Sequence, residues 1–275
     1  MTLITSSSNP KIKLIRALQQ RRQRDASGLF VVEGIFHVGE ALAAGVGVEY
    51  LCYAPDLLTS DFARRLIQEA LAAGIPCLET TAEIMAGLAE KEHPQGLLAV
   101  VRQRRARLAE LTPANFDWGV ALVAPQDPGN VGAILRTIDA VRASGLILLD
   151  SGVDPYHPTA VRASMGALFW HPLASGSFDE FAGWAREHGY HVIGTSAHAA
   201  TDLRASADFP MPLILLMGSE REGLSPQQAA QCELMVRLPM RGRVSSLNLA
   251  VATGIVLYAV LEKLGCEAQD VKREE

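Results

Sequence analysis

Along roughly the first hundred residues, short apolar runs alternate with stretches whose apolar positions recur at helical spacing. Within residues 11–24, Ile12, Ile15 and Leu18 share one side and basic residues fill the rest, which predicts helical character. This alternation indicates a compact α/β unit. The pattern further predicts strands over 29–34, 50–54, 76–79 and 95–101, and helices over 35–44 and 61–73.

Residues 102–117 interrupt this alternation, because a charged stretch is followed by proline and asparagine, which is typical of a linker. Beyond them, strands flanked by helices predict a mainly parallel sheet covered by helices on both faces. Ligands bind such sheets at the carboxyl ends of the strands. The predicted strands cover 119–124, 145–149, 190–195, 213–217 and 233–237, and the predicted helices 131–142, 158–165, 178–188 and 249–261.

A chain of 275 residues with 49% hydrophobic content can form two substantial cores. No apolar run approaches the roughly 18 residues that a membrane span needs, and the polar N-terminus does not resemble a signal peptide. We therefore expect a cytoplasmic protein without membrane contact. The scattered cysteines indicate reduced thiols and no metal site. They are Cys52, Cys77, Cys232 and Cys266.

The net charge of −5 hides two basic clusters. A single charged run is usually a solvated face. Two clusters on an acidic protein favour a phosphate-binding surface as much as they favour solvated faces. The first cluster consists of Lys11, Lys13, Arg16, Arg21, Arg22 and Arg24, and the second of Arg102, Arg104, Arg105 and Arg107.

Three segments carry candidate chemistry, and the last of them, residues 238–250, opens the C-terminal helix. Ser245, Ser246 and Asn248 crowd polar groups at this helix start. Capping by Ser246 is the simpler interpretation. The alternative is a binding site, because free N–H groups at a helix N-terminus favour negative charge.

The first segment, residues 125–137, lies where a strand passes into a helix. Gly129 and Gly132 permit close backbone approach, Asn130 can cap or orient a partner, and Arg136 follows about two turns later. A tight turn with a solvent-exposed arginine would also account for this pattern.

The second segment, residues 213–225, is an apolar strand that ends in a glycine turn around Glu220. An acid at the carboxyl end of a strand suits a ligand site. Equally, Glu220 could cap backbone amides or pair with Arg221 or Arg243.

Together and in this order, the three segments resemble the motifs of the SpoU/TrmH family of RNA ribose 2′-O-methyltransferases, in the SPOUT class. The resemblance covers roughly residues 120–264, and residues 3–101 more loosely resemble the ribosomal-protein-L30e-like substrate-binding domain. The matching positions are 130–136, 161–167, 218–223 and 239–248. The implied domains are an RNA substrate-binding domain at 1–105, a linker at 106–117, a SPOUT methyltransferase domain at 118–266 and a frayed tail at 267–275.

The resemblance implies a deep C-terminal trefoil knot, a rare exception to general topology rules, and a homodimer formed through the knotted domain. It also implies that S-adenosylmethionine binds the knot loops largely through backbone groups. The implied cofactor positions are Thr195, Ser196, Gly218, Leu238, Met240 and Leu247. The implied catalytic residues are Arg136, Asn130, Glu220, Ser246 and Asn248.

The resemblance implies methylation of a ribose 2′-hydroxyl in structured RNA. An arginine is a poor base, so we expect Arg136 to bind the phosphate beside the target ribose, with the proton passing to that phosphate or to water. The extra N-terminal domain favours 23S ribosomal RNA over transfer RNA, and its first basic cluster is the candidate RNA contact. A transfer RNA methyltransferase and a non-catalytic RNA-binding or ribosome-assembly factor remain alternatives.

Overall fold

The computed structural model describes residues 3–89, 94–150, 152–205 and 209–264. The chain forms two compact units, which are described separately. The first unit contains residues 1–105, 127–136 and 154–172, and the second contains residues 106–126, 137–153 and 173–275. Cys266 and the tail predicted over 267–275 lie outside the described residues.

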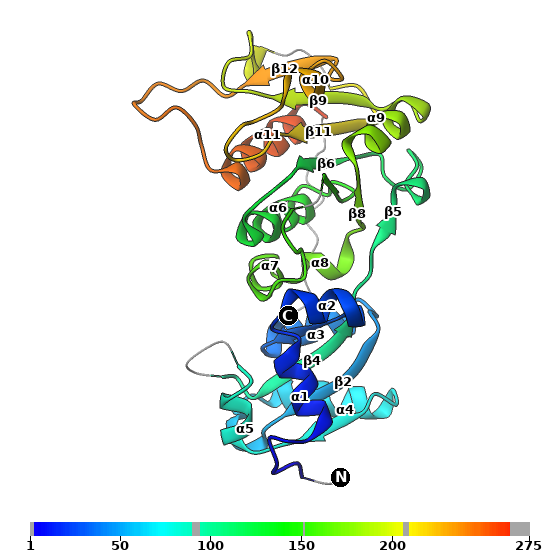
Figure 1. The fold of residues 1–275 in the computed structure, drawn as a ribbon, viewed down its shortest axis with the longest axis vertical. Helices are drawn as coiled ribbons and strands as arrows, with labels where there is room; N and C mark the ends of the chain where they lie inside the picture. Colours follow the sequence, from blue (N-terminus) through cyan, green and yellow to red (C-terminus); the bar gives the residue numbers. More distant parts are fainter. Residues whose placement is uncertain (1–2, 90–93, 151, 206–208, 265–275) are drawn as a thin grey trace. The chain divides into compact units, whose positions relative to one another are not determined.

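The first unit is built on a mixed four-stranded sheet (Figure 1). β4 pairs antiparallel with both β1 and β2, and β3 pairs parallel with β2. In spatial order the strands are β1 (Leu29–Glu33), β4 (Leu97–Arg102), β2 (Val48–Tyr53) and β3 (Cys77–Glu79). Its helices are α1 (Pro10–Ala17), α2 (Arg21–Ser27), α3 (Ile35–Ala43), α4 (Asp61–Ala72), α5 (Ala82–Ala86), α7 (Pro158–Ala163) and α8 (Ala167–Trp170).

The helical character predicted over residues 11–24 is confirmed, but the chain forms two helices there, α1 and α2. α1 ends at Ala17 with Leu18 as its C-cap, and α2 begins at Arg21. Gln20, the N-cap of α2, has an extended backbone that breaks the helical path. Ile12, Ile15 and Leu18 nevertheless pack into the core of this unit with Tyr50 and Val100. The hydrophobic pattern therefore located the buried face correctly but not the break.

The second unit holds an eight-stranded sheet in which every neighbouring pair is parallel. The prediction of a mainly parallel sheet is confirmed. In spatial order the strands are β10 (Thr201–Asp202), β12 (Leu234–Arg237), β9 (His191–Thr195), β11 (Leu213–Met217), β6 (Trp118–Val123), β7 (Leu146–Leu149), β8 (Leu173–Gly176) and β5 (Ala106–Arg107). The helices wholly in this unit are α9 (Phe178–Glu187), α10 (Pro226–Ala229) and α11 (Leu249–Lys263), and α6 (Pro128–Ala140) runs from the first unit into this one.

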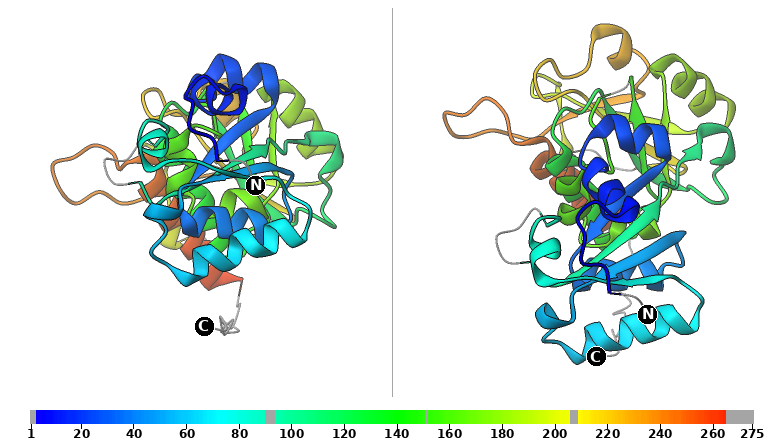
Figure 2. Two further views of the ribbon diagram at one scale, coloured as in Figure 1. Left: turned by 90° about the horizontal axis from the view of Figure 1, so that it is seen from below. Right: turned by 60° about the horizontal axis from the view of Figure 1, so that its bottom comes forward.

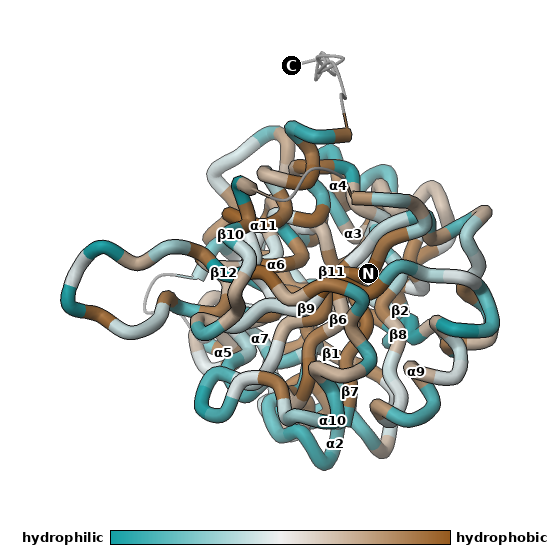
Figure 3. The backbone as a smooth tube through the Cα atoms, turned by 90° about the horizontal axis from the view of Figure 1, so that it is seen from above, coloured by the Kyte–Doolittle hydropathy of each residue, from teal (hydrophilic) through white to brown (hydrophobic). Residues whose placement is uncertain are grey.

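Both faces of this sheet are buried. Phe181 and Trp184 of α9 pack on one face against Ile147 and Ile214, and successive residues of β11 are all buried, so the opposite face is covered as well. Figure 3 shows the central strands β6 and β11 largely in the hydrophobic colour. Continuous apolar strands of this kind are expected in a parallel sheet with two covered faces.

Part of the segment predicted as a linker is ordered in the second unit. Ala106 and Arg107 form the edge strand β5 against β8, and Leu111 and Phe116 belong to the core cluster. None of the helices in the described parts of the chain is both long enough and apolar enough to cross a membrane.

Candidate active site

The first segment forms the start of α6, directly after β6. Pro128 occupies the first turn, and the Asp127 carboxylate accepts a hydrogen bond from the Gly129 N–H at 2.7 Å. Asp127 was not among the predicted site residues, although an acid before proline is a recognised helix-start signal. Asn130, for which capping and orienting a partner were the two predicted roles, lies inside the first turn and is only 7% exposed.

Gly132 is the point where α6 meets α7. A Cβ atom at this position would lie 2.3 Å from the Ala160 carbonyl oxygen, 2.7 Å from the Ala163 Cβ and 3.0 Å from the Ser164 nitrogen. Two of these neighbours are backbone atoms that cannot move away, so the close approach requires glycine. The prediction that Gly132 permits close backbone approach is confirmed.

Arg136 follows Gly132 by four residues and so projects from the same side of α6, one turn further along. Its side chain is exposed and makes no ion pair or hydrogen bond with any described residue. A guanidinium without a protein partner remains available for a phosphate, with which it can form two parallel hydrogen bonds.

The second segment closes a tight turn after β11. A Cβ on Gly218 would lie 2.2 Å from the Gly223 carbonyl carbon, so the two backbone segments cross in contact. Ser219 and Gly223 exchange backbone hydrogen bonds of 3.2 and 3.0 Å. Gly223 has a φ of 68°, a left-handed conformation that glycine adopts without strain. The turn therefore presents a compact backbone at the strand end.

Glu220, at the tip of this turn, accepts hydrogen bonds from the Gln126 N–H at 3.2 and 3.4 Å. Backbone capping, one of the sequence alternatives for Glu220, therefore forms. Gln126 lies between β6 and α6, so Glu220 ties the second segment to the loop of the first. This tie orients the loop that leads into α6.

The third segment is a long exposed loop before α11, which projects in both views of Figure 2. The prediction that Ser246 caps the helix is wrong, because the Asn248 side chain accepts from the N–H groups of Ala250 and Val251 at 2.9 and 3.2 Å. α11 begins at Leu249, where the sequence predicted its start, so Ser246 lies too early to cap it. Leu247 is 36% exposed, and Leu238 and Met240 are half-buried.

The sheet register brings several predicted cofactor positions to one edge. β9 lies between β11 and β12, and their carboxyl ends point the same way. Thr195 therefore lies next to Met217, with its Oγ1 3.4 Å from the Met217 sulfur, and Ser196 donates its N–H to Val236 at 3.0 Å. Gly218 and Leu238 come directly after β11 and β12 and lie at the same edge.

The predicted catalytic residues divide between the two units. Asn130 and Arg136 belong to the first, and Glu220, Ser246 and Asn248 belong to the second.

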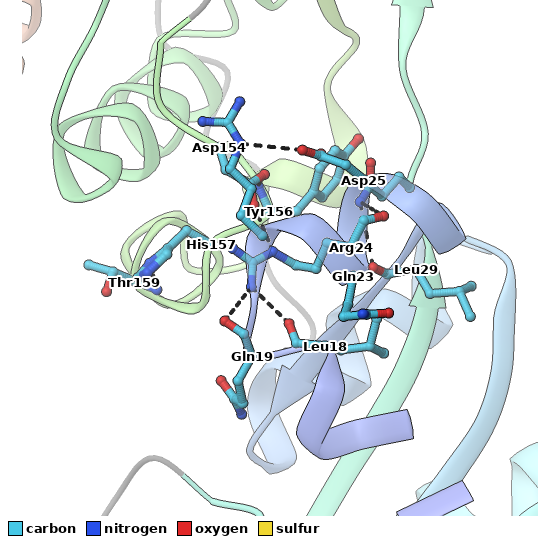
Figure 4. Close-up of polar contacts among 12 residues, drawn as sticks. Leu18, Gln19, Gln23, Arg24, Asp25, Leu29, Asp154, Tyr156, His157 and Thr159 are labelled. Atoms are coloured by element: carbon cyan, nitrogen blue, oxygen red, sulfur yellow. Dashed lines mark hydrogen bonds and ion pairs between the residues drawn. The ribbon is translucent and has the colours of Figure 1, made fainter. Parts of the chain in front are cut away.

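Five of the six predicted RNA contacts are exposed on α1 and α2 of the first unit: Lys11, Lys13, Arg16, Arg21 and Arg22. Arg24 is not, because it is only 1% exposed and pairs with Asp154 (Figure 4). Its guanidinium cannot reach a phosphate in solvent, so the prediction of an RNA contact at Arg24 is wrong.

The thiols of Cys52, Cys77 and Cys232 are free, as predicted. Burial raises the pKa of Cys52 to about 12 and that of Cys232 to about 11, and it also raises the pKa of Cys77. The thiolate is the nucleophilic form. These three cysteines are therefore inert near neutral pH.

Comparison with known proteins identifies the family of the chain. Residues 117–258 match the SpoU rRNA Methylase family, and residues 9–99 match the MRM3-like substrate binding domain. A 23S rRNA (uridine(2479)-2′-O)-methyltransferase of Streptomyces viridochromogenes is 32% identical over 94% of this chain and 91% of its own. The 23S rRNA (guanosine(2553)-2′-O)-methyltransferase RlmP of Bacillus subtilis (strain 168) is 27% identical over 94% of this chain and 98% of its own.

Solved structures show the same fold. An AdoMet-bound rRNA methyltransferase from Sinorhizobium meliloti superposes with a TM-score of 0.87 at 35% identity, covering 96% of this chain and 98% of that one. The resemblance found in the three sequence segments is thus confirmed over nearly the whole chain. The chain belongs to the SpoU rRNA Methylase family and carries an MRM3-like substrate-binding domain ahead of its methylase domain.

Proposed function

We propose that the protein transfers a methyl group from S-adenosylmethionine to a ribose 2′-hydroxyl of 23S ribosomal RNA. The observation that carries this proposal is the shared edge formed after β9, β11 and β12, with the glycine turn at Gly218 and the exposed loop 238–248. Relatives similar over nearly their full length are named as 23S rRNA 2′-O-methyltransferases, and one similar structure is named as AdoMet-bound.

The residues at this edge fit the proposed cofactor. Outside the helices and strands, no hydrogen bond among the described residues involves the backbone of residues 239–247, so their N–H and C=O groups can bind an adenine. Gly218 keeps the strand end free of a side chain. Thr195, Ser196, Leu238, Met240 and Leu247 are the proposed lining, and the cofactor supplies an electrophilic methyl group when bound.

The chain itself has to align the 2′-oxygen, bind the neighbouring phosphate and allow a proton to leave. We assign phosphate binding to Arg136, whose guanidinium is exposed and has no partner among the described residues. A guanidinium with a pKa above about 12 does not accept the proton, which passes to the phosphate or to water. Asn130, Glu220, Ser246 and Asn248 shape the site, and Glu220 holds the Gln126 loop ahead of α6.

The domain boundaries predicted from the sequence are kept in this proposal. Residues 1–105 bind RNA, and residues 118–266 carry methyl transfer and the proposed knot. The family matches at 9–99 and 117–258 support both assignments. Because bacterial ribosomal RNA is in the cytoplasm, the proposed methylation would take place there.

The test is a map of ribose methylation across total RNA from cells with and without the protein. We expect one 23S ribosomal RNA nucleotide to lose its methyl group and the purified protein to restore it. Loss confined to a transfer RNA would replace the proposed substrate. Cofactor binding with no methyl lost from any RNA would instead support a non-catalytic assembly factor.

Asn248 separates helix capping from site chemistry. Asn248→Asp keeps an oxygen that accepts the Ala250 and Val251 N–H groups, so the free energy of unfolding should stay near that of the wild type. Asn248→Ala should lower it by about 1 kcal/mol. If the amide also contacts substrate, both variants lose turnover, and chemical denaturation with methyl-transfer assays reads the two effects separately. Wild-type turnover in Asn248→Asp would confine Asn248 to capping.

We also propose that the protein acts as a homodimer through α11. This helix is apolar on nearly all sides (Figure 3), yet Val251, Ile255 and Tyr258 are 51%, 45% and 54% exposed. They stand at helical spacing beside an open groove lined by Thr137 and Gly254. A helix that is hydrophobic all round is normally buried, which supports a second copy as the cover.

Ile255→Glu should halve the mass measured by light scattering, because an unpaired carboxylate would be buried in the proposed interface. Gln231→Glu adds the same charge at another exposed position and should leave the mass unchanged. A wild-type protein that is monomeric at micromolar concentration would contradict the homodimer.

A further inference from the structure

A buried ion pair joins α2 to the chain that precedes α7, within the first unit (Figure 4). The Arg24 Nε lies 2.6 Å from the Asp154 Oδ2, and the two side chains are 2% and 4% exposed. The Arg24 Nη1 also donates to the carbonyl oxygens of Leu18 and Gln19 at 2.8 and 2.9 Å. The second Asp154 oxygen accepts the Tyr156 N–H at 2.9 Å.

Such a pair holds one specific geometry. Taking two charges out of water is costly unless good geometry and further hydrogen bonds compensate, and both conditions hold here. If either partner moved away, the other would be left as a buried charge without its counter-ion. The pair therefore favours a single docking of two segments that are 130 residues apart in sequence.

Other contacts strengthen the same docking. The Tyr156 hydroxyl donates to the Arg104 carbonyl oxygen at 2.5 Å, and its ring lies 4.7 Å from the Phe30 ring between centroids. The Trp170 Nε1 donates to Glu40 at 2.9 Å. Residues 154–172 are thus attached to the substrate-binding domain at both of their ends.

The docked segment also supports the helix that carries Arg136. Ala160 of α7 and Ser164, which follows the end of α7, lie against Gly132 of α6 so closely that a Cβ would not fit. Arg136 is one turn beyond this contact. A continuous set of contacts therefore runs from α2 through Asp154 and α7 to the start of α6, all within the first unit.

We propose that the Arg24–Asp154 pair is a positioning element that holds the RNA-binding domain at a set distance from Arg136 and so determines which ribose of a bound RNA is methylated. This inference rests on the proposed function. Arg24 acts through α7 and α6 rather than by touching RNA. Its neighbours Arg21 and Arg22 on the same helix remain exposed for RNA.

The experiment compares Arg24→Lys, Arg24→Met and Asp154→Asn with Ile67→Ala. Ile67 is a buried residue of α4 in the same unit, outside the Arg24 contacts, and serves as the control for lost stability. Each protein is assayed with a 23S ribosomal RNA transcript for kcat, KM and the map of methylated nucleotides. S-adenosylmethionine affinity and hydrogen exchange of α7 amides are measured without RNA.

We expect the Arg24 and Asp154 variants to lose about a hundredfold in kcat/KM, since a displacement of about 1 Å has that effect on aligned reactants. Methyl groups should spread to riboses beside the normal target, cofactor affinity should not change, and α7 amides should exchange faster. Ile67→Ala should keep the target unchanged. If Arg24→Met fails to fold, Arg24→Lys and Tyr156→Phe supply the same comparison.

The positioning role is overturned if the Arg24→Lys and Asp154→Asn variants keep the wild-type target and lose no more activity than Ile67→Ala at equal Tm. A wild-type protein that methylates no RNA defeats the proposed function instead. In that case hydrogen exchange still tests whether the ion pair holds α7 in place. Unchanged protection of the α7 amides in Arg24→Lys would overturn that role of the pair.

Discussion

Replacing Arg136 with alanine should lower kcat for methyl transfer by about 10²- to 10³-fold, the loss typical when one charged or hydrogen-bonding group leaves a transition state. Cofactor affinity and Tm should stay near wild type, because the side chain is exposed and has no partner among the described residues. Arg136→Lys should recover only part of the rate, since an ammonium cannot make two parallel hydrogen bonds to a phosphate. Single-turnover kinetics with RNA and cofactor binding measured separately check this.

Arg142→Gln is the matched control for Arg136, because it removes an exposed positive charge just beyond the end of the same helix. It should leave kcat unchanged. Turnover within twofold of wild type in Arg136→Ala would remove Arg136 from the catalytic residues. A loss of similar size in both variants would indicate a general effect of charge on RNA binding.

A methyl group at Gly132 should destabilise the first unit by about 3 kcal/mol, the upper part of the usual range for overpacking. The new Cβ would lie 2.3 Å from the Ala160 carbonyl oxygen, so α6 and α7 would have to separate. Because Arg136 lies one turn away, Gly132→Ala should also lower kcat. Thermal unfolding and methyl-transfer assays measure the two effects.

Gly183→Ala tests the same substitution where space is free. Gly183 lies within α9, and nothing is within 4 Å of the added Cβ. Alanine should stabilise the helix there by about 0.5 to 1 kcal/mol, because glycine loses more backbone entropy on folding. If Gly132→Ala and Gly183→Ala shift Tm in the same direction, the close contact at Gly132 is not the cause of the Tm change in Gly132→Ala.

Where the apolar pattern is strong and local, prediction and structure agree closely. The helix predicted at 61–73 forms over Asp61–Ala72, and the strand predicted at 213–217 forms over Leu213–Met217. In α4 the buried positions recur at helical spacing, because one face of the helix is buried. In β11 every residue is buried, because both faces of the strand are covered. The glycine turns after β11 and before α6 were predictable because only glycine tolerates such close backbone contact.

Weaker local signals were missed or misplaced. β8, with the sequence Leu-Ala-Ser-Gly, is a strand only because it pairs with β7 and β5. The cap of α11 was assigned to Ser246, whereas Asn248 is the residue directly before the helix, and both residue types are good caps. Local propensity does not distinguish these two caps, and it does not predict β8.

The sequence by itself determined the order of the strongly patterned strands and helices, the buried faces, the two close-packed glycines and the family, because each depends on residue type and spacing along the chain. Only the tertiary structure decided the role of Arg24. A basic residue on an amphipathic helix looks like every other solvent-facing cation until its partner is known. Asp154 lies 130 residues away, and the free energy of pairing two buried charges exists only once the fold has brought them together.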